Sequence, residues 1–360
     1  MYDVGIIGAG PAGATLARLL GDRCSVLLLD SGRPKCCGGI LTAESHQILA
    51  QFDLALPKTT LVDSQPFAVA VLDLDNHLVR HYARRYFNID RAAFDAWLVS
   101  LIPNRVDIRR NALYRCCEKT AGNLTLHFTQ DGRNCNETVR YLVGADGAFS
   151  TVRREHFADT PQPKRYAAFQ YWYEKNEVQC GQSSIDFWND YTGIFHRPTT
   201  DFYAWAIPKN DQLIFGGALP MTEPVRGKVK ALQRQLESFG LKFGEPIKRE
   251  ASQVVRPLCY GSVCLGSPQI FLIGEAAGLI SPSSAEGISS ALVSGFHLAN
   301  SYRNGNFQVG LYHRKLWSLR WSLYFKNLKV PIMFCPTIRK TVMLSGLTAL
   351  GSRDVRDIRK

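Results

Sequence analysis

The chain has 360 residues, of which 46% are hydrophobic and 21% charged, so it is long and apolar enough to bury a large core, and we expect two domains. The ten cysteines include no Cys-x-x-Cys pair and the eight histidines form no ligand-spaced cluster, which argues against a disulfide scaffold and against a metal site. No apolar run is long enough to span a bilayer and the first residues do not resemble a signal peptide, so a cytoplasmic location is expected.

A strand, a glycine-rich turn and a helix open the chain. The apolar run 4–7 leads into Gly8-Ala9-Gly10-Pro11-Ala12-Gly13, a helical stretch covers 14–20, and a second apolar run, 26–29, ends in Asp30. Gly8 permits the tight turn, Gly10 lets the backbone approach a pyrophosphate, and Gly13 lets helix and strand pack closely, while Asp30 can accept hydrogen bonds from a ribose. This order and spacing predict a dinucleotide-binding unit.

Two later segments repeat the strand-then-glycine pattern. The expected strand 141–143 runs into Gly144-Ala145-Asp146-Gly147, and the expected strand 270–273 runs into Gly274-Glu275-Ala276-Ala277-Gly278. A dehydrogenase that uses only a nicotinamide dinucleotide would need neither segment. The three segments together therefore favour FAD.

The arrangement resembles FAD-dependent oxidoreductases of the p-hydroxybenzoate hydroxylase type, and within them the geranylgeranyl reductase branch, over nearly the whole chain. Phe202-Tyr203-Ala204-Trp205-Ala206-Ile207-Pro208 is similar to the Tyr-x-Trp-x-Phe-Pro signature of that branch, with Ile207 in place of Phe. Lys35-Cys36-Cys37-Gly38-Gly39 is similar to its Cys-Gly-Gly segment, and Asn88-Ile89-Asp90-Arg91 also matches. The combination most closely resembles the bacterial members associated with colicin M resistance.

The resemblance implies an α/β fold with a Rossmann-type FAD-binding domain, an antiparallel-sheet substrate domain and C-terminal helices. The FAD-binding domain is expected at 1–60, 89–165 and 250–300, the substrate domain at 61–88 and 166–249, and a basic helical segment at 301–360. Short strands are expected at 167–173, 184–188 and 213–217, and a helix at 228–239. Cofactor contacts are expected from Gly8, Gly10, Ala12, Gly13, Asp30, Cys37, Gly38, Gly39, Arg91, Leu113, Asp146, Gly274, Glu275, Pro282, Gly287 and Ile288.

Cys37, Tyr203 and Trp205 are the candidate catalytic or pocket residues, and each has a simpler interpretation. Tyr203, Trp205 and Ile207 alternate, so they could form one buried face of a core strand. Cys37 could be an inert buried thiol, the usual fate of a free cysteine, although the glycines after it indicate a loop that another group approaches closely.

The predicted reaction is reduction of carbon–carbon double bonds in an apolar, isoprenoid substrate by hydride transfer from reduced FAD, with backbone N–H groups before the helix 289–298 facing the flavin. The electron donor, NAD(P)H or an electron carrier, is left open. The alternatives are an FAD-dependent monooxygenase, a flavin halogenase as a more distant third, and a flavin-bearing isoprenoid carrier or sensor without turnover.

The formal net charge of the chain is +12. Residues 301–360 contain twelve lysines and arginines and only two acidic residues, Asp354 and Asp357, so this segment alone carries a net charge of +10. Trp317, Trp321 and Phe325 are interleaved with these basic residues, a pattern typical of a surface that meets anionic lipid. A solvated helical cap is the simpler alternative. Nothing in the sequence indicates a nucleic-acid-binding fold, and the oligomeric state is left open.

Overall fold

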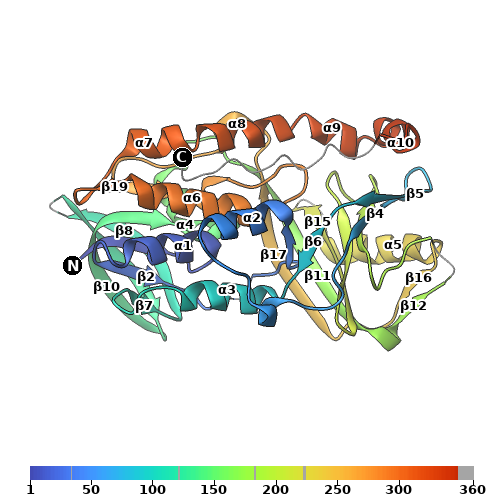
Figure 1. Ribbon diagram of the computed structural model, residues 1–360, viewed down its shortest axis with the longest axis horizontal. Coiled ribbons are helices and arrows are strands. Elements are labelled where there is room, and N and C mark those ends of the chain that lie inside the picture. The colour runs from blue at the N-terminus through green and yellow to red at the C-terminus, as the bar shows by residue number, and fades with distance from the viewer. Residues whose placement is uncertain (34, 121, 182–183, 222–223, 348–360) are drawn as a thin grey trace. The chain divides into compact units, whose positions relative to one another are not determined.

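The computed structural model describes residues 1–33, 35–120, 122–181, 184–221 and 224–347 (Figure 1). The chain forms two compact units, both discontinuous in sequence. The first unit contains residues 1–34, 94–164 and 255–327, and the second contains 35–93, 165–254 and the chain from Leu328 onward. Residues 348–360, the end of the expected basic segment, lie outside the described chain.

The first unit is built on a sheet in the order β7-β2-β1-β10-β9-β8, with β18 also paired to β10. Its parallel part consists of β7, β2, β1, β18 and the last residues of β10, and its antiparallel part joins β8, β9 and the beginning of β10. All four residues of β2 are buried, as in a strand covered on both faces. The strands are β1 (Tyr2–Ile7), β2 (Val26–Leu29), β7 (Asp107–Arg109), β8 (Ala112–Thr120), β9 (Asn123–Gln130), β10 (Arg133–Gly144) and β18 (Ile270–Leu272).

Helices α1 (Pro11–Leu20) and α6 (Ile288–Ser301) run alongside each other in this unit (Figure 1). A Cβ built on Gly295 would lie 2.6 Å from the carbonyl oxygen of Ala12, so the glycine permits this close helix contact. The unit also contains α4 (Thr151–His156), the hairpin β19 (Tyr302–Arg303) and β20 (Asn306–Phe307), and helices α7 (Val309–Lys315) and α8 (Trp317–Lys326). Helix α3 (Arg91–Ser100) begins in the second unit and continues into the first.

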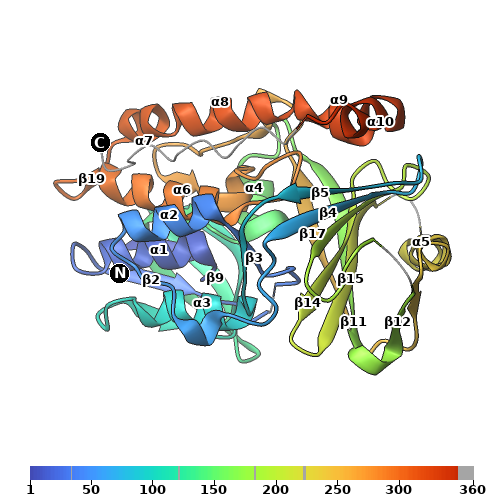
Figure 2. The same cartoon turned by 45° about the vertical axis from the view of Figure 1, so that its right-hand side comes forward.

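The second unit is built on a sheet in the order β17-β11-β15-β14-β13-β4-β5, part of which Figure 2 shows side by side. Its pairs are antiparallel as expected from β11 to β13 and between β4 and β5, but β13 and β4 are parallel, so the sheet is mixed. Its strands are β4 (Ala68–Asp73), β5 (Leu78–Ala83), β11 (Lys164–Glu174), β13 (Tyr191–Phe195), β14 (Ala204–Lys209), β15 (Gln212–Pro220) and β17 (Lys248–Arg256).

One face of this sheet carries the hydrophobic core of the second unit. Helix α5 (Val225–Glu237) packs Val229, Leu232 and Leu236 into a cluster with Phe169 and Phe215, among others. The spacing of these three helix residues puts them on one stripe of the helix. Smaller elements complete the unit: β3 (Ile40–Thr42), α2 (Ala43–Gln51), β6 (Tyr86–Asn88), β12 (Val178–Cys180), β16 (Leu241–Phe243), α9 (Lys329–Phe334) and α10 (Pro336–Leu344).

The structure corrects three expectations about the elements. Residues 35–60, 89–93, 165 and 250–254, expected in the FAD-binding domain, belong to the second unit, where β3 pairs with β6. The expected 301–360 segment is divided, because α7 and α8 belong to the first unit and α9 and α10 to the second. No strand forms over the described part of 184–188; there the Asp186 carboxylate accepts from the Trp188 backbone N–H at 3.0 Å and holds a turn, although Ile185 and Phe187 still reach the core.

Candidate functional site

The three glycine-bearing segments meet at one edge of the first unit's sheet. The segments beginning at Gly8, Gly144 and Gly274 follow β1, β10 and β18, which are parallel neighbours, and Asp30 follows β2 on the other side of β1. The backbone links them directly, since Ala145 N–H donates to Ile7 O at 2.8 Å and Ile273 N–H to Gly144 O at 3.0 Å. In open α/β sheets ligands bind at this carboxyl edge.

The first three glycines have different surroundings. A Cβ on Gly13 would stand 1.9 Å from Gly8 O, and one on Gly8, whose φ is +105°, would stand 2.6 Å from Ala145 O. A Cβ on Gly10, just before α1, would meet no atom of the described residues within 4 Å. Gly8 and Gly13 are therefore required by packing, whereas Gly10 faces open space at a helix N-terminus, which is where a diphosphate would sit.

Asp30 and its neighbours lie at the end of β2. The Asp30 carboxylate accepts from the Gly32 backbone N–H at 3.1 Å, and the Asp30 backbone bridges Arg109 and Ala112. Leu113, which is half-buried, directly follows Ala112 at the start of β8. Ala12 is buried in the first turn of α1 beside Gly274, whose Cβ would lie 2.9 Å from that of Ala12.

Asp146 begins the turn after β10. Its Oδ2 accepts from the backbone N–H of Thr151 at 2.7 Å, while its Oδ1 is buried and has no hydrogen-bond partner in the described part of the chain. Burial raises the pKa of this carboxyl, and bonds from Ser150 and backbone N–H groups only partly offset the effect. The unpartnered oxygen can accept a hydroxyl of a bound ligand.

Glu275 and the loop 281–287 form the third part of this edge. The longer Glu side chain reaches the Val255 backbone N–H at 3.2 Å and so fixes the end of β17. Pro282 is held by Arg256, which donates to its carbonyl at 2.7 Å, and Gly287 immediately precedes Ile288, the first residue of α6.

In the second unit, the segment Cys37-Gly38-Gly39 forms a tightly bound loop. The Ile89 N–H donates to Gly39 O at 2.8 Å, and Gly39 has φ +61° with no room for a Cβ, which would stand 2.2 Å from Ile89 O. Cys37 is half-buried and hydrogen-bonded to Arg91. Burial by itself would raise the pKa of the Cys37 thiol, but Arg91, the Gly39 backbone and Lys35 together hold it below its usual value.

Sequence reasoning missed Lys209, which lies at the end of β14 and is buried. Its Nζ donates to Gly39 O at 3.2 Å, to Ile89 O at 2.8 Å and to Asn88 Oδ1, so three acceptors match the three N–H bonds of an ammonium. Burial nevertheless lowers the pKa of Lys209 to about 7, against the charges of Cys37 and Asp90, which raise it. The only sequence signal was a lysine directly after the apolar run that ends at Pro208.

Strand β14 turns its two faces to different environments. Ala204 and Ala206 belong to the core that packs against α5, whereas Trp205 and Ile207 project from the opposite face. On that face, Tyr203 stacks on Phe195 with ring centroids 5.9 Å apart and contacts Trp205 edge-on at 5.6 Å. Trp205 therefore does not belong to the core that packs against α5.

The face that carries Trp205 also meets the Cys37–Gly39 loop. A Cβ on Gly38 would lie 2.5 Å from Ile207 Cδ1 and 4.0 Å from Trp205 Nε1. Burial raises the pKa of Tyr191, on the same face, well above its ordinary value, with Tyr203 and Tyr86 nearby. Cys37, Tyr203 and Trp205, predicted separately, are thus brought to one region of the second unit.

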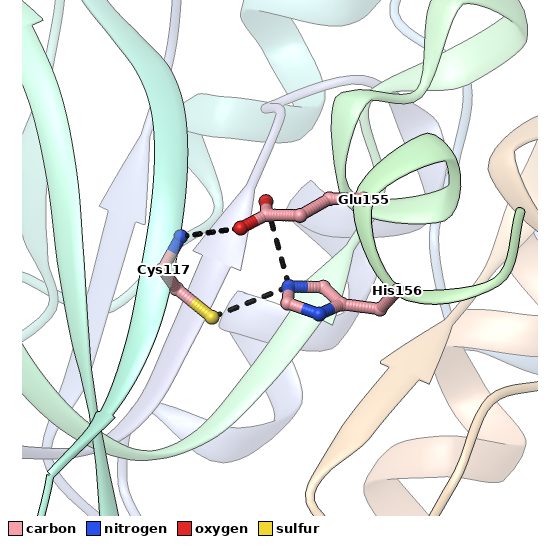
Figure 3. Close-up of side chains that lie close together, drawn as sticks. All are labelled: Cys117, Glu155 and His156. Carbon is pink, nitrogen blue, oxygen red and sulfur yellow. Dashed lines mark hydrogen bonds and ion pairs between the residues drawn. The ribbon is translucent and has the colours of Figure 1, made fainter.

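A different group of side chains lies in the first unit, between β8 and α4 (Figure 3). His156 Nε2 lies 3.3 Å from Cys117 Sγ and 3.4 Å from Glu155 Oε2. A nucleophilic Cys–His–acid relay needs the acid on the second imidazole nitrogen, and here both partners face the same one. Glu155 also accepts from Tyr114 OH at 2.8 Å and from Cys117 N–H at 2.8 Å, so the group ties α4 to the sheet.

The sequence matches no protein-family model. It is 37% identical over 355 residues to Protein CbrA of Shigella flexneri, which covers 96% of this chain and 94% of that protein. Protein CbrA of Escherichia coli O139:H28 is also 37% identical, over 96% of this chain and 97% of the relative. The chain belongs to the CbrA family.

Solved structures share the fold of this CbrA family member. A geranylgeranyl bacteriochlorophyll reductase-like protein of Thermoplasma acidophilum matches with a TM-score of 0.79 and 19% identity over 99% of this chain and 94% of that one. The flavin-dependent brominase Bmp2 matches with a TM-score of 0.65 and 17% identity over 96% and 94%. The p-nitrophenol 4-monooxygenase PnpA of Pseudomonas putida matches with a TM-score of 0.65 and 14% identity, over 96% of this chain and 97% of that one. The family resemblance and the fold class predicted from the sequence are confirmed.

Proposed function

We propose that this CbrA family member is an FAD-dependent oxidoreductase. The observation that carries the proposal is the meeting of the three glycine-bearing segments at the carboxyl edge of β1, β10 and β18, with Asp30 at the end of β2. The residues of this edge fit the adenosine and diphosphate part of FAD, since Gly10 leaves open space at a helix N-terminus and Asp146 Oδ1 is an unused buried acceptor. The solved structures with the same fold include flavin-dependent enzymes by name.

The substrate proposed is a polyprenyl or similarly apolar molecule whose carbon–carbon double bonds are reduced. FAD, when bound and reduced, supplies the hydride. Tyr203, Trp205 and Ile207 offer an aromatic and apolar wall away from the α5 core, which suits a long hydrocarbon chain. The likeness to a geranylgeranyl bacteriochlorophyll reductase-like protein adds support.

The other residues have defined tasks in this proposal. Gly38 and Gly39 let their loop pack closely against Ile207 and Ile89, and Lys209 fixes that loop through Gly39. Arg91 lowers the pKa of the Cys37 thiol, and we assign this sulfur the task of tuning the charge of its surroundings. Tyr203, which contacts Trp205 edge-on at 5.6 Å, is the other candidate donor to the substrate carbon.

We also propose that an anionic membrane surface is a partner. No helix among the described residues is both long and apolar enough to cross a bilayer. In α8, Trp317 and Phe325 are nevertheless 59% and 56% exposed, and Lys326 ends the helix. Exposed aromatic side chains with nearby cations suit the lipid interface, where an apolar substrate would be dissolved.

Anaerobic photoreduction of the FAD-loaded protein tests the oxidoreductase proposal. If added polyprenyl lipids reoxidise the flavin without oxygen and yield a product with one double bond fewer, the reductase is supported. If the flavin reoxidises only with oxygen and the product carries an added oxygen atom, the protein is a monooxygenase instead. A wild-type protein that remains colourless after incubation with FAD overturns both.

A further inference from the structure

The sheet face that carries Trp205 holds two buried polar side chains with unused hydrogen-bonding atoms. Gln170, on β11, is fully buried, and neither its Oε1 nor its Nε2 has a hydrogen-bond partner among the residues that the structure describes. The indole Nε1 of Trp205 is also buried and without one. Buried polar groups are nearly always hydrogen-bonded in folded proteins, so a pair left open on one face needs an explanation.

The two side chains converge on one place. Gln170 lies directly across from Gly216 on β15, and Gly216 lies directly across from Trp205 on β14, so all three positions share one face. Both nitrogen atoms lie close to Gly38, because a Cβ built there would be 3.8 Å from Gln170 Nε2 and 4.0 Å from Trp205 Nε1. The amide nitrogen of Gln170 and the indole nitrogen of Trp205 therefore both lie near the loop Cys37–Gly39.

The chemistry of this group selects its ligand. Both side chains are uncharged, and the nearby ammonium of Lys209 already donates to Gly39, Asn88 and Ile89. The cations nearest in the chain, Arg91 and Lys35, already act on the Cys37 thiol, so a phosphate between these two neutral side chains would share its counter-charge with that sulfur, which is unfavourable. A neutral oxygen could accept from both N–H groups, and a hydroxyl could in addition donate to Gln170 Oε1.

We propose that Gln170 and Trp205 together bind an uncharged carbonyl or hydroxyl oxygen of a ligand placed against Gly38. The proposal rests on the proposed function, which supplies two sources of such an oxygen: a ring carbonyl of FAD, or an alcohol or ketone head of the apolar substrate. In the second case the substrate class narrows to neutral prenyl alcohols, ketones or quinones, and prenyl diphosphates are excluded.

The test compares Gln170→Leu with the wild type in two measurements. In the protein without ligand, the variant should melt at a higher temperature, since it removes two unpaired buried atoms and fills the space with an apolar group. In the FAD-loaded protein, geranylgeraniol is titrated beside the hydrocarbon of the same skeleton that lacks the hydroxyl. The variant should bind the alcohol about fivefold to tenfold more weakly and the hydrocarbon unchanged, as expected for one lost hydrogen bond.

Thr192→Val is the matched control. Thr192 is fully buried on β13, and its Oγ1 has no hydrogen-bond partner within the described ranges. It is paired with Ala206 and therefore lies on the core face of the same sheet. It should raise the melting temperature in the same way and leave both ligands unaffected.

The outcomes separate the possibilities. Weaker binding of the alcohol with unchanged FAD affinity assigns the oxygen to the substrate, whereas weaker FAD binding with a shifted flavin absorption spectrum assigns it to the cofactor. Unchanged affinity for FAD and for geranylgeraniol overturns the inference and leaves water as the partner, and a lowered melting temperature with unchanged binding overturns it in favour of a structural role. If the wild type itself binds no FAD, the proposed function has failed instead.

Discussion

The indole of Trp205 occupies the space that a side chain at Gly216 would need: a Cβ built on Gly216 would lie 2.4 Å from Trp205 Nε1. The two residues are opposite each other in the β14–β15 ladder, on the face away from α5. The glycine therefore lets the indole lie over the neighbouring strand, on the sheet face that Gln170 shares and near Gly38. Because Trp205 lies outside the core that packs against α5, a substitution of Trp205 can be compared with a substitution in that core.

Trp205→Leu should impair turnover of polyprenyl substrates at least tenfold while leaving FAD content and the melting temperature close to those of the wild type, because the pocket wall is lost and the core is not. Phe215→Ala, on the opposite face of the neighbouring strand, should instead destabilise the fold by about 3–5 kcal/mol. Steady-state kinetics and thermal melts of both variants decide this. Equal destabilisation by both changes would mean that Trp205 is a packing residue.

Gly10→Val should leave the protein folded but weaken FAD binding by about tenfold or more, since the added side chain enters the open space where a diphosphate would sit. Gly13→Ala should unfold the first unit, because its Cβ would stand 1.9 Å from Gly8 O. Circular dichroism and the flavin content of the purified variants measure the two effects. A Gly10→Val protein with normal flavin content would contradict the assigned cofactor edge.

Cys37 should react with iodoacetamide at lower pH than its neighbour Cys36 in the protein without FAD. Arg91 and the Gly39 backbone lower the pKa of Cys37, whereas burial and Glu250 raise that of Cys36 to about 12, and only the thiolate is the nucleophile. Mass spectrometry of alkylated peptides against pH gives both profiles. Arg91→Met should move the Cys37 profile to higher pH; coincident profiles for the two cysteines would refute the assignment.

Lys209 should make folding stability depend on pH in the alkaline range. Its pKa is lowered to about 7 in the folded protein from 10.5, so between these values the unfolded chain binds more protons. The free energy of unfolding contributed by this group therefore rises with pH in that window, by at most about 1.4 kcal/mol per pH unit, and the penalty is full below pH 7.

Urea unfolding of wild type and Lys209→Met across this pH range isolates the effect, because other titrating groups are common to both proteins. The variant carries a constant loss from the orphaned acceptors Asn88, Ile89 and Gly39. The difference between the two proteins should change steadily above pH 7. If the free energies of unfolding of the two proteins instead change with pH in parallel, the three acceptors keep the Lys209 ammonium charged throughout.

The protein should sediment with anionic vesicles at low salt and dissociate at high salt. Each basic residue at the lipid surface contributes about 1 kcal/mol, so Arg314→Gln with Lys326→Gln should weaken binding by about tenfold or more. Trp317→Ser with Phe325→Ser tests the apolar part, and Lys119→Gln, on β8, controls for charge alone. A wild type that stays in the supernatant would leave α8 as a solvated cap.

The sequence by itself predicted the three glycine-bearing segments that meet at the edge where we propose that FAD binds. Gly8, Gly13 and Gly274 are needed because their backbones turn sharply or touch a neighbour, and such requirements are local enough to leave a pattern in the chain. The order of strand, glycine segment and helix then placed the three segments at the ends of strands, and parallel pairing of those strands brought them together.

Only the tertiary structure showed which residues of the second unit's sheet face the core and which face the other side. Every residue of β14 from Ala204 to Lys209 except Trp205 is buried, so its alternating pattern could not tell the core face from the pocket face. The register of β11, β15 and β14 put Gln170 beside Trp205, and the folding of the Cys37–Gly39 loop onto Ile89 put Lys209 beneath it. These contacts join residues that are distant in the chain, and a single Gln or Lys leaves no periodic pattern in the sequence. Gln170 and Lys209 could therefore be recognised only in the structure, where packing removes them from water.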